Sequence, residues 1–251
     1  MIGGKRAVAI IAARMKSTRL PGKALMPLCG EPVLWRIVER LSKSAYLDAS
    51  VIATTLDPSD DAIESFCRDR GISCVRGSEK DVLGRVHAAA KQSQAEVIYR
   101  GMGDSPLVDH RIVDRLFELQ NEGGYDFVSN ELEEPAYPVG FDATVFPFSA
   151  LDTAAQEARN AQDREHVTLY LYTRPERFSV FSLTAPKELQ LPGLRVTLDT
   201  PEDYELISQL YDALYPSNPD FSAEEVVTFL RTRPELLAIN AHVEQKMPTK
   251  A

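Results

Sequence analysis

Apolar runs alternate with amphipathic segments along the first half of this chain. The apolar runs at residues 7–12 and 50–55 each predict a strand, because both are short and rich in aliphatic side chains. Between them, Val33, Ile37 and Leu41 recur at the spacing of a helix that buries one face, over residues 32–43. The same reasoning predicts strands at 73–75 and 96–100 and helices at 60–70, 81–92 and 109–122.

The second half of the chain is less regular. Thr200 and Pro201 open a helix there, with threonine as the N-cap and proline in the first turn. A helix is also expected over 150–173, with a break near Asn160. The remaining expected elements are strands at 127–129, 141–146, 178–183 and 194–198 and helices at 222–232 and 234–245.

The alternation of strands and helices indicates βαβ units, and therefore an α/β fold with a mainly parallel central sheet. The chain has no low-complexity linker and no internal repeat. We expect one domain over residues 1–251, with an inserted subregion at about 130–190.

The charge balance narrows the classes of function. The 251 residues include 28 Lys and Arg against 37 Asp and Glu, a net charge of -9. Nucleic-acid-binding domains usually present a basic face, so that class is disfavoured. No stretch approaches the roughly 20 apolar residues that span a bilayer. The apolar run at 7–12 suits a buried first strand better than a signal peptide.

The cysteine content points to a reducing environment. Cys29, Cys67 and Cys74 leave at least one thiol unpaired, and they show no CxxC spacing of the kind that binds metals. We therefore expect structural cysteines in a cytoplasmic protein.

A basic loop directly follows the first predicted strand. Residues 13–23 (ARMKSTRLPGK) contain Arg14, Lys16, Arg19 and Lys23, and their Pro-Gly pair argues against a continuous helix. A loop at the carboxyl end of a strand can aim backbone N–H groups and cations at one phosphate chain. The alternative is a solvated basic connection, but a basic cluster within an acidic chain favours the phosphate cradle.

Two acidic residues also follow predicted strands. Asp104 lies in the segment GMGDSPL, and Asp199 lies in LDTPED before a helix. Mg²⁺ prefers such hard oxygen ligands and often shares them with phosphates. An Asx-type turn is the structural alternative for Asp104. If both carboxylates meet the basic loop at one sheet edge, together they would hold a metal–triphosphate.

These segments together resemble a known family. The run 13–23 is similar to the signature loop of the bacterial CMP–sugar synthetases for 3-deoxy-manno-octulosonate and the acylneuraminates. The resemblance spans nearly the whole chain and points to the SpsF-like branch, named after a spore-coat polysaccharide biosynthesis protein. The further motifs are 77–85 (GSEKDVLGR), 103–107 (GDSPL), Tyr137-Pro138 with Gly140 and Asp142, 164–168 (REHVT), 198–203 (LDTPED) and 239–242 (INAH).

The resemblance implies a Rossmann-like, GT-A-like nucleotidyltransferase fold, with the inserted subregion serving substrate binding and dimerisation. It implies CTP as the donor, Mg²⁺ as the cofactor, release of pyrophosphate, and a homodimer. The acceptor that it implies is a keto-sugar acid, such as a nonulosonic or octulosonic acid, for surface polysaccharide or glycan biosynthesis.

The resemblance also implies roles for individual residues. By position in the motifs, Arg14 and Lys23 match triphosphate-binding cations, and Asp104 and Asp199 match metal-binding carboxylates. The remaining implied nucleotide-binding residues are Ala12 and Ala13 beside the base, Ser17 and Arg19 in the basic loop, and Ser78 and Arg85 at the border of the pocket. Two departures from the branch are Lys16, where many members carry Gly, and Ser105, where Cys or Glu is common.

The acceptor is the least defined part of this hypothesis. A keto-sugar acid needs a cation for its carboxylate, and Arg100, Arg164 and His166 are the candidates. Tyr137 and Asp142 are candidates for binding sugar hydroxyls. His166 has a structural alternative, as a packed and hydrogen-bonded histidine in a helix.

Three other functions stay open at this point. One is a nucleotidyltransferase that uses another base, or a sugar-phosphate or phosphonate acceptor. Another is a GT-A glycosyltransferase, although no DxD-like metal pair follows a strand. The third is a non-catalytic nucleotide-binding protein, against which the presence of both acidic and both basic candidates argues.

Overall fold

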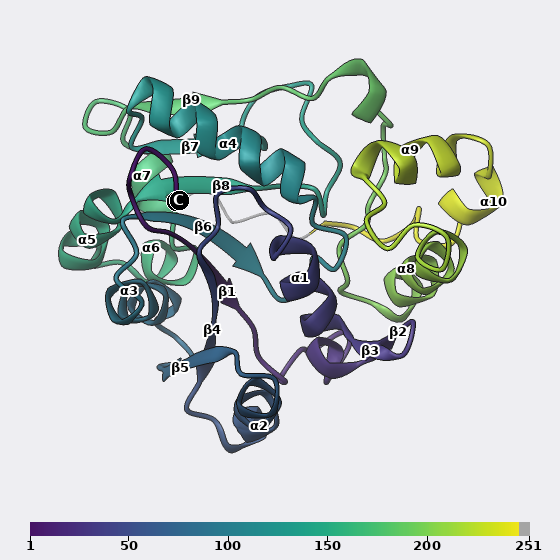
Figure 1. The fold of residues 1–251 in the computed structure, drawn as a ribbon, viewed down its shortest axis with the longest axis horizontal. Coiled ribbons are helices and arrows are strands. Elements are labelled where there is room, and N and C mark those ends of the chain that lie inside the picture. The colour runs from purple at the N-terminus through teal and green to yellow at the C-terminus, as the bar shows by residue number, and fades with distance from the viewer. Residues whose placement is uncertain (246–251) are drawn as a thin grey trace.

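The computed structural model describes residues 1–245, so the last six residues of the expected domain lie outside the described part. Seven strands form one sheet in the order β5-β4-β1-β6-β8-β7-β9 (Figure 1). Their bounds are β1 Ala7–Ala12, β4 Ala49–Thr55, β5 Ser73–Gly77, β6 Val97–Met102, β7 Phe127–Ser129, β8 Thr144–Pro147 and β9 Val180–Ser182. A separate small hairpin pairs β2 (Pro27–Leu28) with β3 (Glu31–Pro32).

The sheet is mainly parallel, which confirms the prediction from the strand–helix alternation. Strand β1 pairs in parallel with β4 and with β6, β4 pairs in parallel with β5, and β7 with β9. Strand β8 runs antiparallel to both of its neighbours, β6 and β7. Because β4, β1 and β6 run in one direction, their carboxyl ends meet at one edge of the sheet, where ligands of such folds bind.

Helices cover both faces of the sheet (Figure 1). One apolar cluster joins one face to α1, α2, α4, α8 and α9, and a second cluster joins the other face to α3, α5 and α7. The α-helices are α1 Val33–Leu41, α2 Asp61–Asp69, α3 Val82–Gln92, α4 His110–Gly123, α5 Phe148–Glu157, α6 Ala161–Glu165, α7 Leu169–Tyr172, α8 Pro201–Leu214, α9 Ala223–Arg231 and α10 Pro234–Leu237, and the 3-10 helices are η1 Lys23–Leu25, η2 Pro58–Asp60 and η3 Lys187–Leu189. The segment 130–190 adds β8 and β9 to the sheet and α5, α6 and α7 to one side of it.

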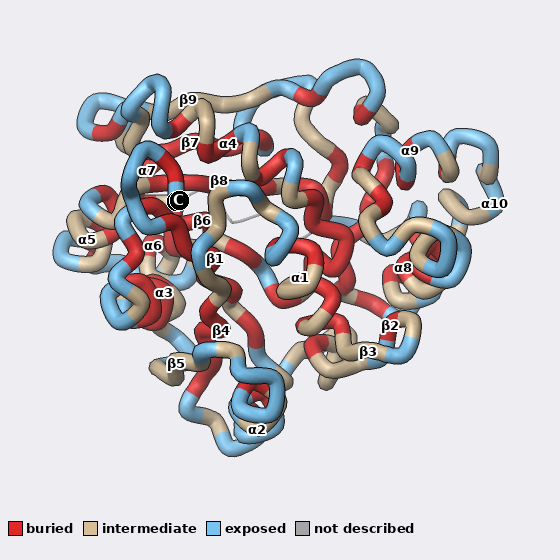
Figure 2. Tube along the Cα trace, viewed as in Figure 1, coloured by how far each residue is buried: buried red, intermediate tan, exposed pale blue. Residues whose placement is uncertain are grey.

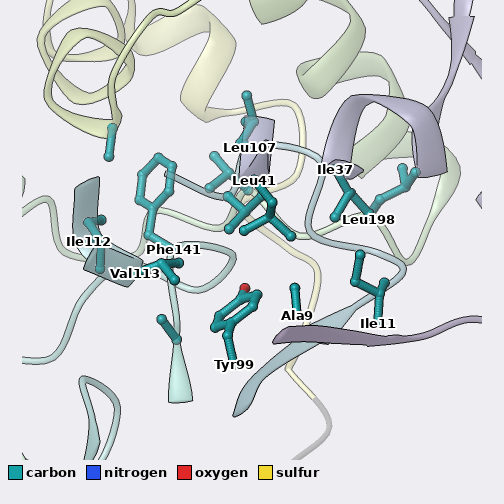
Figure 3. Packing of buried hydrophobic residues seen from close by; sticks show 14 of the residues in the cluster. Ala9, Ile11, Ile37, Leu41, Tyr99, Leu107, Ile112, Val113, Phe141 and Leu198 are labelled. Atoms are coloured by element: carbon teal, nitrogen blue, oxygen red, sulfur yellow. The ribbon is translucent and has the colours of Figure 1, made fainter. Parts of the chain in front are cut away.

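The core lies on both sides of β1. Figure 2 shows the central strands as a buried band, whereas much of α2 faces solvent. Ala9 and Ile11 belong to the cluster that Figure 3 shows beside Tyr99 of β6 and Ile37 of α1, and Val8 and Ile10 belong to the opposite cluster. Burial of alternate residues on opposite faces is typical of a central parallel strand covered by helices on both sides.

Two helix boundaries follow the sequence signals. Asn160 caps α6, because its side chain accepts a hydrogen bond from Asp163 N at 2.7 Å, and this confirms the expected break. Thr200 caps α8 in a capping box with Asp203, with Pro201 at the first position. No helix within residues 1–245 combines the length and the apolar character needed to cross a membrane.

Several predicted elements are wrong or shortened, and the strand expected at 178–183 covers only Val180–Ser182. Residues 194–198 form no strand. They make one isolated β-bridge, in which Arg195 pairs with Val139. Here the backbone bonds to two separate partners, since Val196 N donates to Val139 O and Leu198 N donates to Asp104 O. The strand expected at 141–146 begins at Thr144, because the Asn130 side chain binds the backbone of Phe141 and Ala143 instead.

The last predicted helix, 234–245, ends at Leu237. The chain beyond it brings Asn240 into the interior, where its amide donates to the Asp203 carboxylate and the Arg195 carbonyl. A buried polar side chain with these two partners replaces the helical turn.

Candidate active site

The carboxyl ends of β1 and β6 approach each other closely. Gly103 N, just beyond β6, donates to the carbonyl of Ala12 at 2.9 Å. A Cβ atom built on Gly103 would lie 2.7 Å from the Cβ of Ala13, closer than real side chains come. Glycine is therefore required at position 103. Because it has no side chain, the two strand ends can approach each other, and Asp104 lies next to the start of the basic loop.

The basic loop between β1 and η1 is held at both ends. Met15 N donates to the buried carboxylate of Asp60 at 2.7 Å, and Asp60 also accepts from Thr55 N at the end of β4. Gly22, with φ of 77°, donates from its N–H to Met15 O and is the N-cap of η1. The sequence does not mark Asp60 as an anchor, because its partners are the N–H groups of Met15 and Thr55 and the Thr55 hydroxyl, which form no motif.

Lys23 brings the two predicted metal carboxylates together. Its Nζ atom donates to Asp104 Oδ2, to Asp199 Oδ1 and to the carbonyl of Leu198, each at 2.8 Å. The three charged side chains are 12–16% exposed. The expected convergence of the two carboxylates and the basic loop is therefore present, although Asp199 does not follow a strand and Lys23 binds the carboxylates directly.

Asp199 is surrounded by cations. Besides Lys23 on Oδ1, its Oδ2 atom lies 2.6 Å from Arg195 Nη2 and 3.1 Å from Arg19 Nη2. Burial would raise the pKa of Asp199, but Lys23, Arg195 and Arg19 outweigh it and hold the pKa below its usual value. This carboxylate is therefore charged at neutral pH and fixed in orientation.

A buried network lies behind Asp199. The Arg195 guanidinium donates to both oxygens of Asp203, at 3.0 and 3.1 Å, and Asp203 also accepts from Asp199 N at 2.9 Å. Asn240 donates to Asp203 at 2.8 Å. Sequence reasoning missed Arg195 and Asn240, because nothing local marks either residue as a partner of Asp199 or Asp203.

These groups open into a basic cavity of about 810 Å³. Within residues 1–245, seven basic side chains and four carboxylates line it, in a protein whose net charge is -9. The predicted site residues on its wall are Ala12, Ala13, Arg14, Ser17, Arg19, Lys23, Arg85, Arg100, Asp104, His166 and Asp199. An excess of cations in an acidic protein fits a strongly anionic ligand.

The outer rim of the cavity carries exposed ion pairs. Arg14 lies 2.9 Å from Glu79, and both side chains are about half exposed. Lys16 pairs with Asp57 and is 60% exposed. Such exposed pairs are weak, so Arg14 and Lys16 can exchange these partners for a ligand at little cost.

Arg85 is a buried cation of the cavity wall. It donates to the backbone carbonyls of Ser78 and Glu79, and its Nε is buried without a hydrogen-bond partner in the described chain. Burial, followed by repulsion from Arg14, lowers the pKa of this guanidinium below its usual value. Ser78 contributes its carbonyl to holding Arg85 and does not itself line the cavity.

Arg100 and His166 form a different part of the wall. The Arg100 side chain makes no hydrogen bond or ion pair within residues 1–245, and its Nε is buried without a partner. His166 is half-buried on the same wall, and its ring also has no hydrogen bond within this range. The neighbouring Val167 has φ of 53°, which costs a β-branched residue about 1–3 kcal/mol.

Three of the predicted acceptor residues lie elsewhere. Arg164 makes a two-bond ion pair with Asp81, at 2.6 and 2.8 Å, which ties α6 to the N-cap of α3. Tyr137 lines a separate depression of about 430 Å³. Asp142 accepts from Gly140 N at 2.6 Å and lines neither cavity, and burial is the main cause that raises its pKa.

The donor set suits a divalent cation that is completed by phosphates. No group of three or more His, Cys, Asp or Glu side chains able to hold a metal occurs within residues 1–245. However, Mg²⁺ commonly takes only one or two carboxylates together with substrate phosphates and water. Asp104 Oδ1 is buried and has no hydrogen-bond partner among the described residues, so it has an unused lone pair for a cation.

Comparison with known proteins gives a consistent result. The protein family described as "Cytidylyltransferase" matches residues 8–233. The spore coat polysaccharide biosynthesis protein SpsF of Bacillus subtilis is 37% identical over 233 residues, covering 90% of this chain and 94% of that protein. The 3-deoxy-manno-octulosonate cytidylyltransferase of Bdellovibrio bacteriovorus is 27% identical, covering 81% of this chain and 96% of that protein.

A solved structure shares the whole fold. The structure of a cytidylyltransferase from Leptospira borgpetersenii has a TM-score of 0.84 and 30% sequence identity, and the match covers 97% of this chain and 99% of that one. The likeness therefore includes the segment 130–190 as well as the central sheet.

Proposed function

This chain belongs to the cytidylyltransferase family, and from that premise we propose that it transfers CMP from CTP to the hydroxyl of a keto-sugar acid, with release of pyrophosphate. The observation that carries this proposal is the basic cavity in which Lys23 lies within hydrogen-bonding distance of both Asp104 and Asp199. The negative charge of a triphosphate would be complementary to the excess of cations in this cavity. The two carboxylates would bind the Mg²⁺ that accompanies the triphosphate.

The residues of the cavity divide into groups. Arg14, Arg19 and Lys23 would bind the triphosphate and neutralise charge that builds on the departing pyrophosphate. The backbone at Ala12 and Ala13 would contact the base, and Arg85 would border it. Little covalent chemistry falls to the protein in phosphoryl transfer, so positioning and charge provide most of the rate enhancement.

Asp104 and Asp199 are the residues that would hold Mg²⁺. When bound there, the ion would neutralise phosphate oxygens and lower the pKa of the acceptor hydroxyl. Arg195 and Arg19 keep the Asp199 carboxylate oriented, and Thr197 and Leu198 bind the Asp104 carbonyl and so fix its backbone.

Arg100 would hold the carboxylate of the acceptor. It is a half-buried cation without a partner in the described chain, and it lies on the same cavity wall as Asp104. His166 would donate to the same carboxylate or to a neighbouring sugar hydroxyl. Both relatives named above are consistent with this chemistry, since one acts in polysaccharide biosynthesis and the other is named for an octulosonate.

The test is pyrophosphate release with Mg²⁺, comparing CTP, UTP, GTP and ATP against a panel of 3-deoxy-2-keto sugar acids, sugar phosphates and phosphonates. CTP-dependent release with a sugar acid supports the proposal. Release only with a sugar phosphate or a phosphonate would show that this compound, and not a sugar acid, is the acceptor. Release with none, together with no thermal stabilisation by CTP, rejects the nucleotidyltransferase assignment for this cavity.

A further inference from the structure

Every N–H of the Lys23 ammonium already has a partner. An ammonium has three donors, and those of Lys23 bind Asp104 Oδ2, Asp199 Oδ1 and Leu198 O. Its side chain is only 12% exposed. Lys23 therefore cannot bind a phosphate without breaking at least one of these hydrogen bonds.

A divalent cation held by Asp104 and Asp199 would compete with Lys23 for the same two carboxylate oxygens. Mg²⁺ binds oxygen at about 2.0–2.1 Å, so an ion bound to both oxygens would lie within van der Waals distance of the ammonium. The two cations repel each other and compete for the same lone pairs. Asp104 Oδ1 is buried and has no partner among residues 1–245, so it is a further oxygen ligand that Lys23 does not occupy.

We propose that Lys23 is an exchangeable occupant of the metal position: a divalent cation displaces its ammonium from Asp104 and Asp199, and the released ammonium becomes available to the anionic ligand of the cavity. The destination of the ammonium rests on the function proposed above, but the displacement itself does not. Metal and triphosphate would then assist each other, because each stabilises the arrangement that the other needs.

The surroundings allow this exchange without a wider rearrangement. Asp199 keeps Arg19 and Arg195 on Oδ2 when Lys23 leaves Oδ1. The Asp104 backbone stays bonded to Thr197 and Leu198. Lys23 begins a short 3-10 helix directly after Gly22 and already lines the cavity, so a change of side-chain rotamer is sufficient to redirect it.

The first test measures Mn²⁺ binding to the full-length protein without nucleotide, by electron paramagnetic resonance. Lys23→Met removes the competing ammonium and keeps the apolar length of the side chain. Lys16→Met is the matched control, because Lys16 is in the same loop and lines the same cavity but pairs with Asp57. We expect Lys23→Met to bind Mn²⁺ about tenfold more tightly or better, within the usual range of coupling, and Lys16→Met to change less than about threefold.

Adding Asp104→Asn to Lys23→Met should abolish the gain in Mn²⁺ affinity. This result would show that the ion binds at Asp104. Equal or weaker Mn²⁺ binding by Lys23→Met would overturn the proposal, as would an equal gain in Lys16→Met, which would indicate a general effect of charge.

A second test uses the wild-type protein, so it does not depend on a variant that folds. Lys23 is acetylated with an N-hydroxysuccinimide ester, and the modified peptide is quantified by mass spectrometry with and without Mg²⁺. We expect slow acetylation in the absence of Mg²⁺ and at least a severalfold increase when Mg²⁺ alone is added. Lys43, which pairs with Asp220 outside the cavity, is the internal reference. An unchanged Lys23 rate would overturn the proposal. CTP binding measured alongside separates this result from failure of the nucleotide assignment.

Discussion

Arg195 and Asp203 form a buried two-bond ion pair directly behind the Asp199 carboxylate. The bonds are 3.0 and 3.1 Å long, and the two residues are 5% and 0% exposed. A second Arg195 contact, 2.6 Å from Nη2 to Asp199, connects this pair to the candidate active site. Arg195 is therefore a positioning residue that acts through Asp199.

Arg195→Met should destabilise the fold and slow the reaction. Removing Arg195 leaves the buried charge of Asp203 without its cation, which costs about 3–5 kcal/mol of unfolding free energy. Urea denaturation measures this loss, and Arg177→Met is the control, because the Arg177–Glu157 pair is over 40% exposed and should contribute far less to stability. Equal losses in the two variants would contradict the buried-pair argument.

Lys23→Ala should reduce turnover by about 100- to 1000-fold, the range for losing one preorganised charge that stabilises a transition state. The measurement is steady-state pyrophosphate release at saturating Mg²⁺. Lys16→Ala provides the comparison, since Lys16 is 60% exposed and should lose less than about tenfold. Turnover near wild type in Lys23→Ala would remove this residue from the catalytic assignment.

Asp104→Ala should lose about 100- to 1000-fold in Mg²⁺-dependent turnover through loss of the metal. Asp57→Ala removes a carboxylate that pairs with Lys16 at the rim, and it should keep activity within about tenfold of wild type. If Asp104→Ala retains the wild-type dependence of rate on Mg²⁺ concentration, the metal is held elsewhere.

Arg100→Met should raise the KM for the acceptor by about 10- to 100-fold, which corresponds to losing one charge-assisted hydrogen bond. The KM for CTP should stay close to wild type. Arg164→Met is the matched variant: its guanidinium binds Asp81 outside the cavity, so it should lower the melting temperature but leave the acceptor KM unchanged. If Arg164→Met raises the acceptor KM and Arg100→Met does not, Arg164 is the residue that binds the acceptor carboxylate.

Asp199 should make the fold sensitive to acid. Its folded-state pKa lies below its usual value, so the unfolded chain binds the proton more readily than the folded protein. The stabilisation from Asp199 is therefore complete above the unfolded pKa of about 3.9 and is lost as the pH falls through the folded pKa. Between pH 6 and pH 3, the unfolding free energy of the wild type should fall more steeply than that of Asp199→Asn. If the unfolding free energies of the two proteins change in parallel with pH, Asp199 does not contribute to the acid sensitivity.

Hydrophobic periodicity was sufficient to predict the elements around the site. The strand at 7–12 and the helix at 109–122 match β1 and α4 within one residue at each end, because burial on a sheet or on one helix face leaves a repeating local pattern. Prediction failed at 194–198 and 234–245. There the backbone and Asn240 satisfy their hydrogen bonds with distant partners, and such bonds have no period in the sequence.

The sequence by itself determined which chemical groups flank the predicted elements: a basic loop after β1, Asp104 after β6, and Asp199 before α8. These assignments depend only on neighbouring residues. The tertiary structure alone decided which groups meet. Lys23 bonds to Asp104 and Asp199, which lie 81 and 176 positions away, and Arg164 pairs with Asp81 outside the cavity. Contacts across such separations depend on how the chain closes around the sheet, and no local pattern of residues encodes them.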